Sequence, residues 1–190
     1  AMGLATPTAL MVGIGKAAQK QILIKDATAL ENLRKINALV IDKTGTLTIP
    51  NQNVDFTKAD SLDLEARETL KPHATEAMTR LQREGIEVYM MSGDKENAAR
   101  YWAMKAGIKH YQSQVKPGDK QALVAKLQAS GDKVMMIGDG INDTQALALA
   151  DVSMAIGKGT DVAMDVAQVT LMGDDLMAIP DAVKLSRKEG

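Results

Sequence analysis

Three polar residues of this sequence stand directly after short apolar runs. They are Asp42 after the run ALVI, Ser92 after VYMM and Asp139 after VMMIG. If these runs are neighbouring strands of a parallel sheet, the three side chains meet at its carboxyl edge, where α/β proteins bind their ligands. Two carboxylates that converge there repel each other unless a cation lies between them, and oxygen ligands without a nearby Cys or His suit Mg²⁺. The spacing therefore predicts a magnesium site, and with it a phosphate-containing ligand.

The segment that begins with Asp42 has the residue types of a phosphate-binding turn. It reads DKTGT at 42–46, where Gly45 permits unusual backbone dihedrals and hydroxyl and amide groups can surround a phosphate. The carboxylate of Asp42 is placed to attack phosphorus and form an aspartyl phosphate, which divides a difficult transfer into two steps. A single carboxylate at a strand end is more often a cap or turn residue, so this interpretation depends on a second motif.

The second motif is GDGIND at 138–143, in which two glycines flank Asp139 and an Asn-Asp pair stands at the start of a predicted helix. Its last residue, Asp143, is alternatively the N-cap of that helix. Lys120 opens another predicted helix, where a positive charge is poorly matched to the helix dipole unless an anion lies nearby. A bound phosphate would be that anion, and the alternative is an ordinary solvated lysine. Together, the two motifs favour chemistry over simple turns.

These residues need a scaffold that brings strand ends together, and the hydrophobic pattern from Ala38 onward predicts one. Short apolar runs alternate with amphipathic stretches, which is typical of βαβ units and a mostly parallel sheet. The polar stretch 50–70 is predicted to be a connector with a short strand at Val54–Thr57. We expect strands at 38–42, 88–91, 109–112, 134–137, 153–156 and 169–172, and helices near 72–84, 95–106, 118–129, 143–149, 160–167 and 175–188.

The composition excludes several other classes of function. The 190 residues carry a net charge of −1 and are 45% hydrophobic, as in an ordinary globular protein. Aromatic residues make up only 3% of the chain, which leaves too few rings to stack bases and argues against nucleic-acid binding. Cysteine is absent, so disulfides, thiolate metal sites and cysteine nucleophiles are excluded.

The N-terminal run, residues 1–15, contains no ionisable side chain and is followed by Lys16, Lys20 and Lys25. A secretory signal would carry its positive charge before the apolar run, and a membrane-spanning helix needs about 20 apolar residues. Two interpretations stay open. The run is either the cut end of a membrane helix with its lysines on the cytoplasmic side, or a soluble helix with one apolar face.

Four motifs occur in order along the chain: DKTGT at 42–46, SGD at 92–94, KPGDK at 116–120 and GDGIND at 138–143. In this order they resemble the phosphorylation domain of the P-type ATPases, which belong to the haloacid dehalogenase superfamily. The resemblance implies an α/β, Rossmann-like haloacid dehalogenase fold with a mostly parallel sheet and helices on both faces. The segment GLATPTA at 3–9 is more similar to the copper/silver branch of heavy-metal pumps than to the zinc branch, so copper is the expected ion.

The resemblance also divides the chain into parts. Residues 36–49 and 68–190 would form the phosphorylation domain, and 1–35 an N-terminal helical segment resembling the cytoplasmic end of a membrane helix. The family inserts a complete nucleotide-binding domain where this chain has only the connector 50–67. A domain needs at least ~50 residues, so none fits there. We therefore expect this chain to be a piece of a longer pump, namely a cytoplasmic part of an integral membrane protein. The piece itself would be soluble and could not transport an ion alone.

The resemblance assigns roles within the site. Asp42 would take the γ-phosphoryl group of ATP, and Mg²⁺ would be held by Asp42, the Thr44 carbonyl and Asp139. Asn142 and Asp143 would support the metal site without binding the ion directly. The implied partners are ATP, the nucleotide-binding, actuator and membrane domains of the parent, and a transported heavy-metal cation such as Cu⁺ that this chain does not bind. The residues implied to bind the phosphoryl group are Lys43, Thr44, Gly45, Thr46, Ser92, Gly93, Asp94 and Lys120, of which Thr44, Ser92 and Lys120 act with Asp42 in catalysis.

Three positions that differ from related families bear on function. Ser92 replaces the usual threonine and keeps the hydroxyl, and Glu68 replaces the usual aspartate of the Asp-x-x-Arg/Lys-Pro hinge. Thr44 stands where related phosphatases have an aspartate that activates water, so a phosphoenzyme would last longer here, as a pump requires. The alternatives are a soluble phosphatase of the same superfamily and a non-enzymatic phospho-receiver module that signals through a partner.

Overall fold

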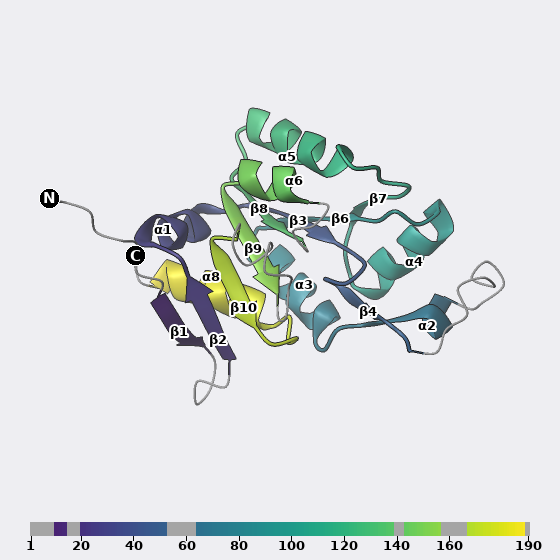
Figure 1. Ribbon diagram of the computed structural model, residues 1–190, viewed down its shortest axis with the longest axis horizontal. Helices are drawn as coiled ribbons and strands as arrows, with labels where there is room; N and C mark the ends of the chain where they lie inside the picture. The colour runs from purple at the N-terminus through teal and green to yellow at the C-terminus, as the bar shows by residue number, and fades with distance from the viewer. Residues whose placement is uncertain (1–9, 15–19, 53–63, 139–142, 157–166, 189–190) are drawn as a thin grey trace, which may run out of the picture.

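One sheet of eight strands forms the centre of the computed structural model (Figure 1). The structure describes residues 10–14, 20–52, 64–138, 143–156 and 167–188. The strand order is β1-β2-β10-β9-β8-β3-β6-β7; from β10 to β7 neighbouring strands are parallel, while β2 is antiparallel to β10 and β1 to β2. The strands are β1 (Leu10–Ile14), β2 (Lys20–Ile24), β3 (Ala38–Asp42), β6 (Glu87–Met91), β7 (His110–Gln112), β8 (Val134–Ile137), β9 (Val152–Ile156) and β10 (Val169–Met172).

The parallel part of the sheet confirms the predicted α/β fold class. All six predicted strands are present within one residue of their expected bounds, and five of the six predicted helices are present with ends within three residues. The strand predicted at Val54–Thr57, and the helix predicted at 160–167 apart from its last residue, lie outside the described residues. The chain passes from β3 outward to β6 and β7, then crosses to the other side of β3 to form β8, β9 and β10. Such a switch in direction marks the place where sheets of this kind bind ligands.

Helices cover both faces of the sheet, with α5 and α6 at the top of the view in Figure 1. β3 is buried along its whole length, because Leu39 and Ile41 pack against one helical layer and Ala38 and Val40 against the other. A strand that is buried on both faces reads as a continuous apolar run, which is why the sequence reveals it. The first layer contains α1 (Ala27–Lys35), α3 (Ala74–Arg83), α4 (Glu96–Lys105) and α8 (Ala178–Lys188), and the second α5 (Asp119–Ala129) and α6 (Thr144–Leu149).

The helical segment expected over 1–35 is wrong for β1 and β2, which form a hairpin and join the sheet through β10. Ile22 and Ile24 are fully buried whereas Leu23 between them is partly exposed, a period of two that fits a strand with one face in the core. The edge of β10 supplies backbone partners for β2, and the local sequence pattern cannot reveal that edge. The described part of this segment is helical only in α1, where the Asp26 side chain caps the first turn.

The polar stretch predicted as a connector is ordered at both ends. β4 (Thr48–Pro50) and β5 (Glu68–Leu70) form a separate antiparallel pair, and the one-turn helix α2 (Leu64–Arg67) precedes β5. Pro50 lies opposite Glu68 in this pair. The two ends of the segment therefore lie side by side, so a chain inserted between them can leave and return at one place.

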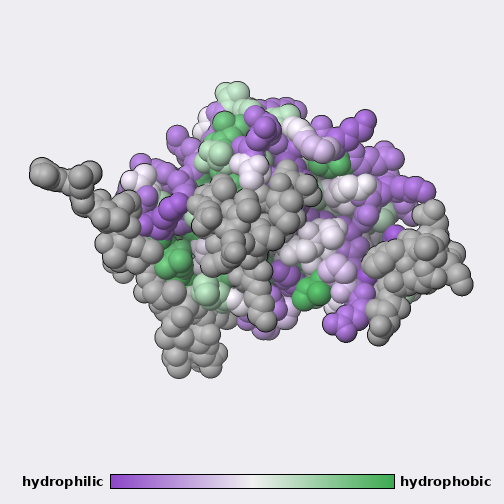
Figure 2. Space-filling view, in the orientation of Figure 1, coloured by the Kyte–Doolittle hydropathy of each residue, from purple (hydrophilic) through white to green (hydrophobic). Residues whose placement is uncertain are grey.

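The surface carries mostly polar residues. On the face drawn in Figure 2, hydrophilic residues predominate and apolar ones are interspersed among them. Among the described residues, the large apolar side chains that are exposed are Ile49, Met104, Leu149 and Met172. No helix within the described ranges has the length and apolar character needed to cross a membrane.

Candidate functional site

The carboxyl edge of the sheet gathers the polar residues that follow the strands. Asp42 is the last residue of β3, Ser92 directly follows β6, and Gly138 directly follows β8. Because β3 pairs with both β6 and β8, these three strand ends are adjacent. Asp139 and Asn142, two residues predicted to belong to the metal site, lie outside the described residues and stay predictions.

A lysine and two aspartates from three different elements meet at this edge, and we name them the Lys120 cluster. Lys120, in the first turn of α5, places its Nζ 2.7 Å from Asp42 Oδ1 and 2.8 Å from Asp143 Oδ1. Asp143 stands at the N-terminus of α6, but its side chain makes no capping hydrogen bond there and accepts one from Lys120 instead. Lys120 is therefore not a freely solvated lysine, and Asp143 is not a side-chain cap.

Gly138 makes room for the Asp143 carboxylate. A Cβ at Gly138 would lie 2.4 Å from Asp143 Oδ2 and 3.1 Å from Asp143 Cβ, well inside normal contact distance. A glycine is thus needed at this position for Asp143 to reach Lys120.

Burial changes the protonation of the Lys120 cluster. The pKa of Asp42 is raised to about 8 by burial first, then by a hydrogen bond to Asp143 and by the charge of that carboxyl, against the opposing effect of Lys120. Burial disfavours the Lys120 ammonium, but the charges of the two aspartates and the hydrogen bonds to them outweigh it and raise the pKa of Lys120. Asp42 therefore keeps a proton at neutral pH, and a further cation bound beside it would favour its carboxylate form.

The oxygen donors at this edge fit Mg²⁺. The predicted ligands within the described residues are the Asp42 carboxylate and the Thr44 carbonyl, and Asp143 adds a buried carboxylate beside Asp42. Hard divalent cations bind oxygen donors of this kind. Within the described ranges, which omit Asp139, no group of three or more His, Cys, Asp or Glu side chains is close enough to hold a metal ion. The fit therefore depends on the chemistry of the donors and on the raised pKa of Asp42, which a bound cation would lower.

The turn after β3 is closed by its own backbone. Gly45 has a φ of +80°, in the left-handed region that favours glycine, and its N–H donates to the Thr48 carbonyl at 3.0 Å. Thr44 is exposed next to Asp42, whereas Thr46 is buried. The turn therefore presents Thr44 and Gly45 to a ligand and keeps the Thr46 side chain inside.

Lys43 turns to the opposite face of the sheet, where it forms what we name the Lys43 cluster with Glu68, Asp94 and Thr48. Its fully buried ammonium pairs with the carboxylates of Glu68 in β5 and of Asp94, the latter at 2.5 Å. Thr48 Oγ1 donates to Glu68 Oε1 at 2.5 Å. The ammonium also lies 6.0 Å from the centre of the buried Trp102 ring in α4. The side chains of Lys43 and Asp94, both predicted to bind the phosphoryl group, are thus engaged with each other in this structure.

The Lys43 cluster is the part of the site that sequence reasoning missed. The sequence marks Glu68 only as a departure at the hinge, and nothing in the spacing links it to Lys43 across 25 positions. Thr48 follows the DKTGT motif but shows no chemistry of its own, and Trp102 lies on a helix distant in sequence. The available signal is that Lys43 follows a strand end, where successive side chains point to opposite faces.

Ser92 is held in place by backbone hydrogen bonds. Its N–H donates to the Gln112 carbonyl at 3.0 Å, and its Oγ accepts from the Asp94 N–H at 3.0 Å. A Cβ at Gly93 would meet only the Val115 carbonyl oxygen, at 3.9 Å, so Gly93 is not sterically required. Ser92 therefore offers a fixed hydroxyl at the sheet edge.

Sequence comparisons identify related proteins. The profile of the haloacid dehalogenase-like hydrolases matches residues 52–151. The chain is 31% identical to the probable copper-transporting ATPase PacS of Synechocystis sp. and 30% identical to the copper-exporting P-type ATPase of Staphylococcus aureus strain JH9. Both alignments include 98% of this chain, but the chain spans only 40% and 36% of the length of these relatives. The alignments extend over 295 and 285 positions, more than the 190 residues of this chain, so the relatives contain a stretch that has no counterpart here.

The fold also occurs among solved structures. A zinc-transporting PIB-type ATPase in its E2.Pi state matches 88% of this chain and 43% of that chain, with a TM-score of 0.74 and 22% identity. At this level of identity the likeness concerns the fold alone. It agrees with the mostly parallel α/β sheet described above.

Proposed function

Given that this chain belongs to the haloacid dehalogenase-like hydrolases and is homologous to copper-transporting P-type ATPases, we propose that it is the phosphorylation domain of an ATP-driven heavy-metal pump. Asp42 receives the phosphoryl group in this proposal. The observation that carries it is the Lys120 cluster, in which a nearly buried carboxylate lies 2.7 Å from an ammonium at the carboxyl edge of the sheet. Copper is the proposed cargo because both named relatives are described as copper pumps.

The proposed reaction moves the γ-phosphoryl group of ATP onto Asp42. A carboxylate oxygen of Asp42 bonds to phosphorus while the bond from phosphorus to the bridging oxygen breaks, and ADP leaves with the electron pair. The product is an acyl phosphate. Lys120 lies where its ammonium can neutralise charge on the phosphoryl oxygens, and such fixed charges supply most of the catalysis in phosphoryl transfer.

Asp42 must be ionised to attack phosphorus. With a pKa of about 8, its carboxyl keeps a proton at neutral pH when only Lys120 opposes the effects of burial and of Asp143. Mg²⁺, when bound by Asp42, the Thr44 carbonyl and Asp139, would supply the positive charge that favours the carboxylate and shields the phosphoryl oxygens. Asp143 would support this arrangement together with Asn142, and its bond to Lys120 keeps that ammonium at the site.

The remaining contacts to the phosphoryl group would come from hydroxyl and amide groups. Ser92 offers a hydroxyl that the Asp94 N–H holds in place, and Thr44 and Gly45 form the exposed part of the turn beside Asp42. Lys43 does not join them, because its ammonium is enclosed by carboxylates behind the turn. Its part in the proposal is to position the turn that carries Asp42.

Thr44 supports a pump rather than a phosphatase. A phosphatase of this superfamily needs an acid or base two residues after the nucleophile to activate water, and the hydroxyl of Thr44 is too weak a base for that step. The acyl phosphate at Asp42 would therefore persist. A transport cycle needs this lifetime, because the phosphorylated state must last while other domains move.

We further propose that the stretch present in the relatives and absent here is their nucleotide-binding domain, inserted between β4 and β5. The paired ends of the connector, with Pro50 opposite Glu68, support an insertion at this point. ATP would then reach Asp42 from that domain in the parent, and the actuator and membrane domains would couple phosphorylation to transport. This chain alone would not transport an ion.

The test uses acetyl phosphate, a small phosphoryl donor that needs no nucleotide-binding domain. With Mg²⁺ present, intact mass spectrometry should detect one phosphoryl adduct on the wild-type chain and none on Asp42→Asn. Asp26→Asn, which keeps the capping oxygen of α1 and lies outside the site, is the matched control and should form the adduct normally.

The lifetime of the adduct separates the possible functions. A slowly decaying, hydroxylamine-sensitive adduct supports the pump, whereas fast phosphate release with repeated turnover supports a phosphatase. An adduct that forms equally well on Asp42→Asn would contradict the assignment of the nucleophile.

A further inference from the structure

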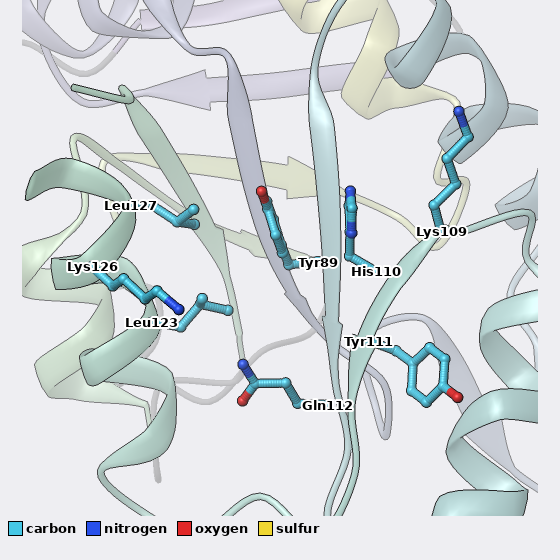
Figure 3. Close-up of a pocket in the computed structure, with 8 residues that line it drawn as sticks. All are labelled: Tyr89, Lys109, His110, Tyr111, Gln112, Leu123, Lys126 and Leu127. Atoms are coloured by element: carbon cyan, nitrogen blue, oxygen red, sulfur yellow. The ribbon is translucent and has the colours of Figure 1, made fainter. Parts of the chain in front are cut away.

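A hollow separate from the phosphorylation site lies on the α5 face of the sheet, beside β6 and β7 (Figure 3). Its volume is about 400 Å³, within the range that small ligands occupy. No residue of the Lys120 or Lys43 cluster lines it, so phosphorylation does not account for it. The lining includes Tyr89, His110, Gln112, Leu123, Lys126 and Leu127.

The hollow exists because α5 covers only part of this face. α5 packs on β3 and β8, while α4 packs against β7 as part of the opposite helical layer. Leu123 and Leu127 are nearly buried, and Figure 3 shows them pointing from α5 toward the Tyr89 ring with space between. One wall of the hollow is therefore aliphatic and the other aromatic.

The aromatic wall is a stacked pair. The rings of Tyr89 and His110 lie 4.8 Å apart with an angle of 18° between their planes, on neighbouring positions of β6 and β7. His110 Nε2 lies 3.0 Å from Glu87 Oε2, which fixes the imidazole against the phenol ring. The other face of Tyr89 is left toward the leucines, and a planar ring inserted there would stack on it.

The two ends of the hollow differ in charge. At the end next to the aromatic wall, Glu87 places a carboxylate oxygen 3.0 Å from His110 Nε2. Burial first, and then the negative charges of Glu87 and Asp132, raise the pKa of Tyr89. At the other end, Figure 3 shows the Lys126 ammonium and the Gln112 amide directed toward the space between α5 and the sheet. Lys126 is exposed and forms no ion pair with any residue in the described part of the chain. A ligand with a donor at one end and an acidic group at the other would match both.

We propose that this hollow is a second binding site, which takes a planar, amino-substituted heteroaromatic ring that carries an acidic group. An adenine mononucleotide has this chemistry: the ring stacks between Tyr89 and the leucines, the amino group lies toward Glu87 beside His110, and the phosphate pairs with Lys126. The inference is independent of phosphorylation at Asp42.

The test is a titration of the ¹⁵N-labelled chain with AMP, followed by amide chemical shifts. AMP should bind saturably and shift the amides of β6, β7 and α5. Adenosine, which lacks the phosphate, should bind about tenfold more weakly, because a charge-assisted hydrogen bond contributes roughly that factor. IMP, with a carbonyl in place of the amino group, should also bind more weakly than AMP. Failure of AMP to saturate, or equal affinities for AMP and adenosine, would refute the proposal.

Variants locate the ligand. Lys126→Ala should weaken AMP about tenfold and leave adenosine unchanged, while Lys184→Ala on α8 is the charge-matched control and should have no effect. Asp42→Asn and Lys120→Ala should bind AMP like the wild type. Loss of AMP binding in Lys120→Ala but not in Lys126→Ala would place the nucleotide at the phosphorylation site and overturn the proposal.

Discussion

Asp42 and Lys43 are neighbours in sequence, yet their side chains enter two different ionic clusters. Each cluster joins one lysine to two carboxylates: Lys120 contacts Asp42 and Asp143, and Lys43 contacts Glu68 and Asp94. The Lys120 side chain is 20% exposed and that of Lys43 only 1%. The two clusters are thus alike in charge and differ in access to solvent and ligand.

The difference in access separates a reacting group from a supporting one. In the Lys43 cluster a hydroxyl from Thr48 and the face of Trp102 complete the environment of the ions, and the contacts tie β5 to the turn after β3. In the Lys120 cluster the pKa of Asp42 stays raised, so the carboxyl is poorly satisfied until a further cation arrives. The Lys43 cluster, whose charges are paired and buried, therefore supports the structure. The Lys120 cluster is accessible and its Asp42 carboxyl would gain from a further cation, so it can bind a ligand.

The largest expected effect is a loss of stability when the lysine of the Lys43 cluster is removed. Lys43→Met leaves Glu68 buried without a counter-charge, so the free energy of unfolding should fall by ~3–5 kcal/mol. Urea denaturation measures this loss. The double variant Lys43→Met/Glu68→Gln should regain part of it, and a loss below ~1 kcal/mol in the single variant would show that the cluster is not a structural element.

Removing the lysine of the Lys120 cluster should instead lower the rate of phosphorylation. Lys120→Met withdraws the ammonium from Asp42 and from the incoming phosphoryl group, and the rate of adduct formation from acetyl phosphate should fall by roughly 10²–10³. Intact mass spectrometry of samples quenched at successive times measures the rate, and circular dichroism checks that the fold is kept. Lys184→Met is the matched control. An unchanged rate in Lys120→Met would remove the distinction between the two clusters.

Displacing Asp143 should have a smaller effect on the same reaction. In Gly138→Ala the new Cβ meets the Asp143 carboxylate, so Lys120 loses one of its two partners and moves. The rate of adduct formation should fall by roughly tenfold to a hundredfold, as a misplacement of about 1 Å does elsewhere. Gly118→Ala, where a Cβ meets no atom within 4 Å, is the control. Equal rates in both variants would mean that Asp143 does not position Lys120.

The last expected effect is a gain in the stability of Asp42→Asn relative to the wild type, and this gain depends on pH. The pKa of Asp42 is raised from 3.8 to about 8 on folding, so in the presence of a chelator the wild type loses stability as pH rises between these values. Asp42→Asn does not titrate, and its melting temperature relative to wild type should therefore increase from pH 4 to pH 8. Glu68→Gln in the Lys43 cluster should instead lower the free energy of unfolding by ~1–3 kcal/mol. A difference between Asp42→Asn and wild type that does not change with pH would contradict the raised pKa.

The sequence predicts the central strands well because their signal is local. β3 and β8 are buried along their whole length, so each reads as an uninterrupted apolar run. The polar residues that end the runs, Asp42 and Ser92, are then located at the carboxyl edge by the fold rule alone.

Contacts between distant segments are harder to predict. Nothing in the sequence pairs Lys43 with Glu68, because the pairing depends on the β4–β5 ribbon closing. The N-terminal hairpin was missed for a related reason: β2 depends on the free edge of β10, which lies about 150 positions later in the chain. The Lys120 side chain could be recognised as a candidate but not placed, since its partners come from the ends of two other elements.

The most direct test of the central claim is to identify the side chain that carries the phosphoryl group. Borohydride reduces an aspartyl phosphate to homoserine, so treatment of the acetyl phosphate adduct followed by tandem mass spectrometry marks the modified residue. The account predicts homoserine at position 42 and unmodified aspartate at 143. Homoserine at 143, or an adduct that leaves Asp42 unreduced, would contradict it.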